Sequence, residues 1–413
     1  MKRLWLALPL LIFVLLASCS TTRTLLRTAP TTPQGMVASP ILPMVSRERW
    51  QDEIVPYIRT ALQDTIYGRF PKTLTLERID STALEGTFFN DSATISLQTL
   101  AITNPATGAV REFGLVIARP VGALPDVPVI MMENFCPNTA VFPIPQIPKP
   151  DGDFMSCDGK GLMSHVFGYF FGRYIATPPT AMIMDHGYAL ASVFPSEFIP
   201  DTAEGGVKAL DQFFADQLAA TRTHVIMAWA AQYSLLSDYL KSREGFSKTI
   251  AYGHSRFAKA ALVAATFDPT IDAVVAHQSG TGGASLSRDK TGEGLESISK
   301  NYPHWFLPKF STYAKNKAAL PVDQHQLLAL IAPRPMFLGN ARRDVWSDPN
   351  GAFRAAQAAS IAYGLYGREG LRQKTLKDFD PTADIAFWLR PGTHGVVKED
   401  WPAFLEFLDA HFK

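Results

Sequence analysis

The stretch Gly253-His254-Ser255-Arg256-Phe257 places a serine between a short apolar run, "TIAYG", and an alanine-rich segment, "RFAKAALVAATF". A serine between a strand and a helix has an exposed hydroxyl and nearby backbone N–H groups, which suits a nucleophile beside an oxyanion hole. Serine is also a common helix N-cap, so this stretch alone leaves a structural role open. The usual nucleophile signature is G-x-S-x-G, and here Phe257 replaces the second glycine.

A serine nucleophile needs a base, which near neutral pH is usually histidine. His394 in "RPGTHGVVKEDW" stands late in the chain, after a strand-like run and in a glycine-bounded loop. In α/β hydrolases the chain order is serine, acid, histidine. Two aspartates, Asp344 and Asp348, follow the apolar run "PMFLGN" between the serine and the histidine. We predict that Asp344 is the catalytic acid and that Asp348, which precedes Pro349, is the N-cap of the next helix.

The elements that must position these residues alternate along the chain. Apolar runs typical of strands alternate with segments of helical periodicity, and this pattern predicts a mostly parallel sheet covered by helices on both faces. Ligands bind such sheets at the carboxyl ends of the strands, where the three residues would meet. The predicted strands include residues 111–120, 126–135, 187–195, 248–253, 272–280 and 384–392, and the predicted helices include 225–242, 256–267, 349–367 and 401–412.

Composition indicates a globular domain without a nucleic-acid partner. The chain has 413 residues, of which 47% are hydrophobic, and its net charge is +1, so it lacks the basic surface that nucleic-acid binding needs. No repeat or second linker divides the chain after residue 45. We therefore expect a single catalytic domain over residues 46–413, acting as a monomer.

The first 19 residues read as an export signal. A basic start is followed by an apolar run that is too short for a comfortable membrane span. The sequence "LASC" resembles a bacterial lipobox, which predicts cleavage before Cys19, lipid on its thiol and anchoring to the outer membrane, with a plain signal peptide as the alternative. Residues 20–45 are rich in Thr and Pro and are expected to form a flexible tether. Cys136 and Cys157 could form a disulfide in that compartment or remain free thiols.

Six ordered segments resemble the glucuronoyl esterases of carbohydrate esterase family 15, in their bacterial branch. They are "GHSRFAKAAL", "SGTGGASLSRDKTGE", "YPHWF", "LPVDQHQLLALIAPRP", "DVWSDPNGAF" and "GTHGV…DW". The resemblance implies an α/β-hydrolase fold, a three-layer sandwich around a mostly parallel sheet. It implies hydrolysis, without metal or cofactor, of the 4-O-methyl-glucuronoyl esters that link glucuronoxylan to lignin alcohols.

The resemblance also assigns roles to individual residues. Ser255 matches the nucleophile, His394 the base and Arg256 a residue that stabilises the oxyanion. The expected sugar-binding residues are Lys259, Glu293 and Trp346. Without the resemblance, Lys259 would be interpreted as a solvated lysine and Trp346 as an ordinary core residue. We expect His304 and Trp305 in "YPHWF" to belong to the scaffold.

The chain departs from the family pattern in two places. Many members carry a catalytic Glu just before the "SGxGG" stretch, where this chain has Gln278, so the acid must come from the later loop that holds Asp344. In addition, Ala258 precedes Lys259 where a glycine is usual. Two other hypotheses for the function remain: a broader carbohydrate acyl or acetyl esterase, and a carbohydrate-binding lipoprotein of the same fold that has lost its activity.

Overall fold

The computed structural model describes residues 27–35, 45–151, 157 and 172–413. The export signal and the lipidated Cys19 predicted above lie outside the described residues. Within the described part of the chain, no helix is both long and apolar enough to cross a bilayer.

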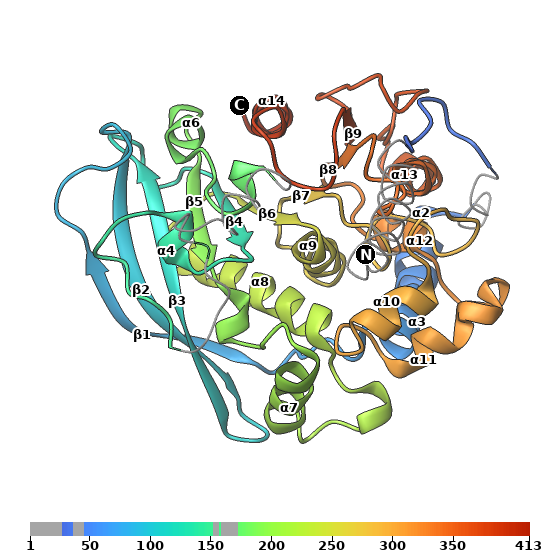
Figure 1. The fold of residues 1–413 in the computed structure, drawn as a ribbon, viewed down its shortest axis with the longest axis horizontal. Helices are drawn as coiled ribbons and strands as arrows, with labels where there is room; N and C mark the ends of the chain where they lie inside the picture. Colours follow the sequence, from blue (N-terminus) through green and yellow to red (C-terminus); the bar gives the residue numbers. More distant parts are fainter. Residues whose placement is uncertain (1–26, 36–44, 152–156, 158–171) are drawn as a thin grey trace, which may run out of the picture.

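The core of the protein is a nine-stranded sheet with the strand order β1-β2-β3-β5-β4-β6-β7-β8-β9 (Figure 1). Strands β4 to β9 are parallel, whereas β1, β2 and β3 are joined to one another and to β5 in antiparallel fashion. This arrangement confirms the predicted α/β-hydrolase architecture. The strands are β1 (Thr75–Ala83), β2 (Ala93–Asn104), β3 (Ala109–Pro120), β4 (Val129–Glu133), β5 (Ala189–Val193), β6 (Thr249–His254), β7 (Ala273–His277), β8 (Met336–Ala341) and β9 (Ile385–Arg390).

Helices cover both faces of the sheet, as predicted. Figure 1 shows α6 and α14 on one side of the sheet and α8, α9 and α13 on the other. The helices are α2 (Arg47–Arg49), α3 (Val55–Leu62), α4 (Asn138–Val141), α6 (Thr180–Asp185), α7 (Ala203–Phe213), α8 (Val225–Ser242), α9 (Arg256–Phe267), α10 (Leu295–Asn301), α11 (Pro308–Thr312), α12 (Gln324–Ala329), α13 (Pro349–Gly364) and α14 (Asp400–Phe412).

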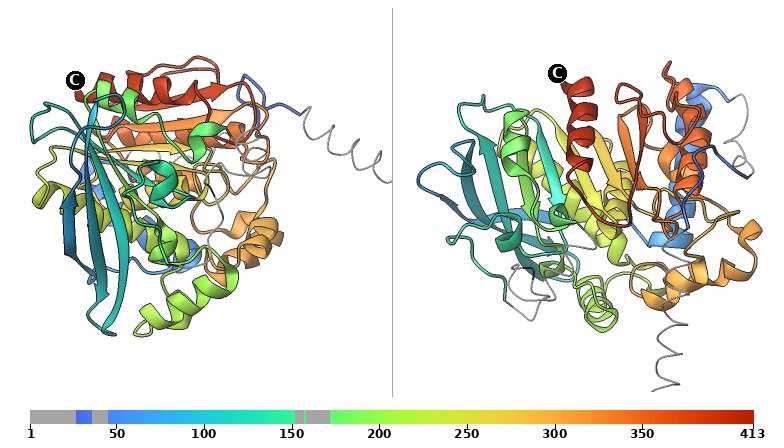
Figure 2. Two further views of the ribbon diagram at one scale, coloured as in Figure 1. Left: turned by 60° about the vertical axis from the view of Figure 1, so that its left-hand side comes forward. Right: turned by 45° about the horizontal axis from the view of Figure 1, so that its top comes forward.

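Side-chain alternation in the central strands explains the two-sided core. In β4, Met131 packs into the cluster formed with α8, α9, α12 and α13, whereas Ile130 and Met132 pack into the cluster formed with α6 and α14. Because successive strand residues point to opposite faces, a strand that is apolar at every position can bury both of its faces. The continuous apolar runs in the sequence therefore become the middle of the sheet, and the more polar β1 lies at its exposed edge, where the blue strand stands in Figure 2.

Part of the predicted tether is fixed to the domain. In the segment 27–35, the Ala29 N–H donates to the Arg342 carbonyl, which lies just after β8. Gln34 exchanges two hydrogen bonds with the Asn350 side chain of α13, at 2.9 and 2.8 Å. These contacts bring the chain that leaves the predicted export signal to the same edge of the sheet as the loop after β8.

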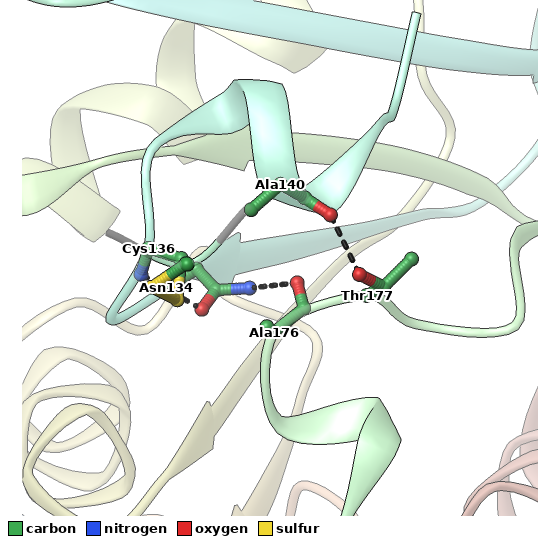
Figure 3. Close-up of a disulfide and its surroundings, with 6 residues drawn as sticks. Asn134, Cys136, Ala140, Ala176 and Thr177 are labelled. Atoms are coloured by element: carbon green, nitrogen blue, oxygen red, sulfur yellow. Dashed lines mark hydrogen bonds between the residues drawn. A yellow bond between two sulfur atoms is a disulfide. The ribbon is translucent and has the colours of Figure 1, made fainter. Parts of the chain in front are cut away.

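A disulfide joins Cys136 and Cys157, with a Cα–Cα distance of 5.8 Å. It anchors the loop that follows β4, and Figure 3 shows the hydrogen bonds around it. The Asn134 amide donates to the Ala176 carbonyl at 3.0 Å, and the Thr177 hydroxyl donates to the Ala140 carbonyl at 2.7 Å. Of the two alternatives left open by the sequence, the cysteines adopt the paired one, which contributes about 3 kcal/mol in the chain-entropy model.

Candidate active site

Ser255 stands at a sharp turn between β6 and α9, with φ 56° and ψ −117°. A Cβ at position 253 would lie 2.3 Å from the backbone carbonyl group of Phe257, so only glycine fits there. The second glycine of the usual signature is not needed, because the Phe257 side chain turns into the core. Its ring packs at 4.9 Å from the rings of Phe135 and Trp229. The strained backbone at a non-glycine residue is typical of a functional turn.

His394 and Asp344 are brought together from two different loops. The Asp344 Oδ2 atom lies 2.7 Å from His394 Nδ1, and the aspartate side chain is almost completely buried. Burial alone would raise the pKa of Asp344, but the charge and hydrogen bond of His394, together with Ser347, outweigh burial and hold that pKa below its usual value. The carboxylate is therefore ionised at neutral pH and fixes the tautomer of the ring.

Asp348 has a different position, as the N-cap of α13. Its carboxylate accepts from the Gly351 N–H and from the Thr291 hydroxyl, both at 3.0 Å. Pro349 occupies the first helical position, where a missing N–H costs nothing. Of the two aspartates, Asp344 is thus the one that contacts the imidazole.

The His394 ring lies beside the turn that carries Ser255. Its centroid is 4.7 Å from that of His254, the residue directly before the serine. No hydrogen bond of the Ser255 hydroxyl is present among the residues that the structure describes. In enzymes without bound substrate, such catalytic contacts are often long and shorten in the complex.

Two buried histidines, His254 and His277, lie in a row next to the His394 ring. His254 Nδ1 lies 3.1 Å from His277 Nδ1, and His277 Nε2 lies 3.4 Å from the carboxylate of Asp400. Burial, with the positive charges of His394 and His277 next in importance, lowers the pKa of His254 well below its usual value. An uncharged His254 next to His394 avoids repulsion when His394 gains a proton.

Arg256 is held by a carboxylate that the sequence reasoning missed. Its guanidinium pairs with Asp201, which also accepts from His304 Nε2 at 3.0 Å and from Trp305 Nε1 at 2.8 Å. The guanidinium lies 4.9 Å from the Trp305 ring and 5.1 Å from the Phe135 ring. The motif "YPHWF" therefore acts as scaffold, as expected, by fixing Asp201. Asp201 ends the segment "VFPSEFIPD". The only sequence signal for its role was a charged residue placed after a predicted strand.

Contacts link the segments that carry the three expected sugar-binding residues. Lys259 is 4% exposed, donates to the Ser279 carbonyl and lies near enough to Glu293 for the two charges to interact. The Glu293 N–H donates to the Trp346 carbonyl at 3.0 Å. Trp346 is 53% exposed, so it is not the ordinary core residue that the sequence without the family resemblance would suggest. Lys290, which donates to the Thr281 hydroxyl, is a further lysine in this region that the sequence did not single out.

Lys259 gives the site a pH dependence. Burial lowers its pKa to about 8, and Glu293 opposes that shift. Because the folded pKa lies below the unfolded value, the unfolded chain binds more protons between about pH 8 and 10, and this lysine should make wild-type stability rise with pH in that window. Lys259→Met should reduce this rise, leaving the part contributed by Lys290, whose pKa burial also lowers to about 8. It should also lower kcat/KM for a uronate ester by about 10- to 100-fold below pH 8, where a charged hydrogen bond is lost. Identical pH profiles of kcat/KM and of unfolding free energy in both proteins would contradict this role.

No group of three or more His, Cys, Asp and Glu side chains in the described part of the chain is arranged to hold a metal ion.

Comparisons with known proteins agree with this geometry. A sequence profile described as "Glucuronyl esterase, fungi" matches residues 175–367. Carbohydrate esterase MZ0003, from an unknown prokaryotic organism, is 29% identical over 394 residues, which are 92% of this chain and 89% of the relative. The 4-O-methyl-glucuronoyl methylesterase 1 of Wolfiporia cocos is 26% identical over 54% of this chain and 62% of its own length.

Solved structures show the same similarity over almost the whole chain. A promiscuous CE15 esterase from a marine bacterial metagenome superimposes with a TM-score of 0.80 at 26% identity, over 92% of this chain and 98% of that protein. The glucuronoyl esterase from Solibacter usitatus gives a TM-score of 0.75 at 26% identity, over 93% and 99% of the two chains.

Proposed function

Because the chain belongs to the glucuronoyl esterase family, carbohydrate esterase family 15, we propose that Ser255, His394 and Asp344 are the triad with which it hydrolyses glucuronoyl esters. The observation that carries this assignment is the 2.7 Å contact between Asp344 and the His394 ring, beside the turn that holds Ser255. An acid supplied by the loop after β8 supports an active enzyme over an inactive binding protein.

In the proposed mechanism, the Ser255 hydroxyl attacks the uronoyl carbonyl carbon while His394 Nε2 takes its proton. Asp344 stabilises the resulting imidazolium. Arg256 and backbone N–H groups at the start of α9 stabilise the oxyanion of the tetrahedral intermediate. The C–O bond to the alcohol then breaks, and His394 protonates the leaving oxygen. Water, activated by the same histidine, hydrolyses the acyl-serine and releases the uronic acid.

The proposed substrate is a 4-O-methyl-glucuronoyl ester that joins glucuronoxylan to a lignin alcohol. Lys259 and Glu293 offer a cation and a carboxylate for the sugar hydroxyls, and the exposed Trp346 ring offers a flat apolar surface for the sugar ring. These groups all serve the acid side of the ester. Specificity should therefore depend on the uronate more than on the alcohol.

A broader acyl esterase is the second candidate function, since one similar solved protein is itself described as promiscuous. Hydrolysis of methyl 4-O-methyl-glucuronate should be measured beside release of acetate from acetylated xylan, with Ser255→Ala as the inactive control. We expect kcat/KM for the uronate ester to be higher by at least tenfold. Equal or greater activity on acetylated xylan would support the second candidate instead.

We also propose that the enzyme is exported and attached to the outer membrane by lipid on Cys19. The disulfide between Cys136 and Cys157 supports an oxidising compartment. Fractionation of cells that produce the full chain is the test, because a lipid anchor requires detergent for release and the protein would otherwise be found in the soluble fraction.

A further inference from the structure

Gln278 directly follows β7 and has an unusual backbone for a residue with a long side chain. Its φ is 53°, in the left-handed region that favours glycine, and the residue is 1% exposed. Its N–H donates to the Gly339 carbonyl of β8 at 2.8 Å, which fixes this conformation. Such strain is retained where the side chain has a specific task.

The Gln278 side chain joins both backbone groups that flank His394. Its Nε2 donates to the Thr393 carbonyl at 3.2 Å, and its Oε1 accepts from the Gly395 N–H at 2.8 Å. The loop that carries the base is therefore held at two points, one on each side of the histidine. The amide uses one donor and one acceptor, and an ionised carboxylate of the same shape can only accept.

We propose that Gln278 is a positioning residue for His394, and that the reaction in this chain needs an amide at this position rather than a carboxyl. The inference rests on the proposed role of His394 as the base. The position that the family resemblance associates with a catalytic acid has here a different task, since the acid contact is made by Asp344. A carboxylate at 278 would face the Thr393 carbonyl oxygen without a proton to offer, and the loop would shift.

The charges around this amide decide how a substituted carboxyl would behave. Arg390 Nη2 also donates to the Thr393 carbonyl, at 3.2 Å, and to the Gly395 carbonyl, at 2.7 Å. Arg390 favours an ionised carboxyl, and burial favours a protonated one. A protonated carboxyl has one donor and one acceptor, the same pattern as the amide. The titratable and charged groups packed around the position are His254 on β6, His277 on β7, Arg390 on β9, Asp400 on α14, and Asp344 and His394 on their loops.

The test measures kcat and KM of Gln278→Glu and Gln278→Met on methyl glucuronate from pH 5 to 8, relative to wild type in the same assay. We expect both variants to lose about 10- to 100-fold in kcat at pH 7.5 with KM changed less than threefold, because the base is misplaced while the sugar contacts remain. As the pH falls, the ratio of Gln278→Glu to wild type should rise. The ratio for Gln278→Met, whose side chain has no proton to gain, should stay flat.

Gln373 offers a matched control for the loss of stability. It is buried and makes the same pair of opposite bonds to a backbone, with Nε2 donating to the Phe387 carbonyl at 3.1 Å and Oε1 accepting from the Phe387 N–H at 3.0 Å. We expect Gln373→Glu to lower the melting temperature with kcat within twofold of wild type. The inference would be overturned if both Gln278 variants kept the wild-type kcat, or if the ratio of Gln278→Glu to wild type did not change with pH. It would also be overturned if Gln373→Glu lost as much kcat as Gln278→Glu. The wild-type rate itself tests the proposed function separately.

Discussion

Asp344→Asn should lower kcat on methyl 4-O-methyl-glucuronate by about four orders of magnitude, with little change in KM. An asparagine at this position keeps the shape but lets the ring adopt the wrong tautomer, and it cannot stabilise the imidazolium. The aspartate contacts His394 Nδ1 and asparagine keeps its size, so substrate binding should be retained. Steady-state kinetics with the wild type and the variant at equal concentration are the measurement.

Asp348→Asn is the control for this experiment, because it makes the same chemical change four residues away. Asparagine is also a good N-cap and tolerates the left-handed backbone of Asp348, so only a small loss of stability is expected. Because the pKa of Asp344 lies below its usual value, the wild-type carboxylate stays ionised between pH 6 and pH 8, and the comparison should be made at several pH values in that range. An Asp344→Asn protein within tenfold of wild type, or an Asp348→Asn protein with the larger loss, would reverse the assignment.

Arg256→Met should lower kcat by about 10²- to 10³-fold, the cost of removing one preorganised oxyanion donor. The guanidinium is fixed by Asp201 and by the faces of Trp305 and Phe135, so little reorganisation is needed when charge develops on the substrate oxygen. Lysine cannot reproduce the planar group in that space, so Arg256→Lys should recover only a small part of the rate.

Asp201→Asn distinguishes direct from indirect action at Arg256. The arginine would keep its charge but lose the ion pair, whereas His304 and Trp305 would still have an amide oxygen to donate to. We therefore expect a loss in kcat smaller than that of Arg256→Met. If Arg256→Met keeps kcat within threefold of wild type, the arginine does not act on the oxyanion and serves only to neutralise Asp201.

The alternation of the central strands and helices could be predicted from the sequence, because it depends on local periodicity. The helix 225–242 and the turn at Ser255 occur where the pattern places them, and the Asp344–His394 contact follows from chain order along parallel strands. Neither β1 nor β2 was predicted. β1 is the edge strand and β2 is its antiparallel neighbour, and the pairing of the two depends on each other.

The supports of the site could not be read from the sequence, since they join residues far apart in the chain. Asp201 contacts residues more than fifty positions away, and Gln278 contacts the loop at 393–395. At position 278 the sequence shows only that glutamine stands where many family members have a catalytic glutamate. Its use as an amide becomes visible once both backbone groups beside His394 are placed.

The disulfide described above lies next to the site of the Arg256 guanidinium. Phe135, whose ring lies against the Arg256 guanidinium, is the neighbour of Cys136 in the chain. In a reducing compartment this disulfide would not form, and the chain at Phe135, beside the Arg256 guanidinium, would be held by noncovalent contacts alone.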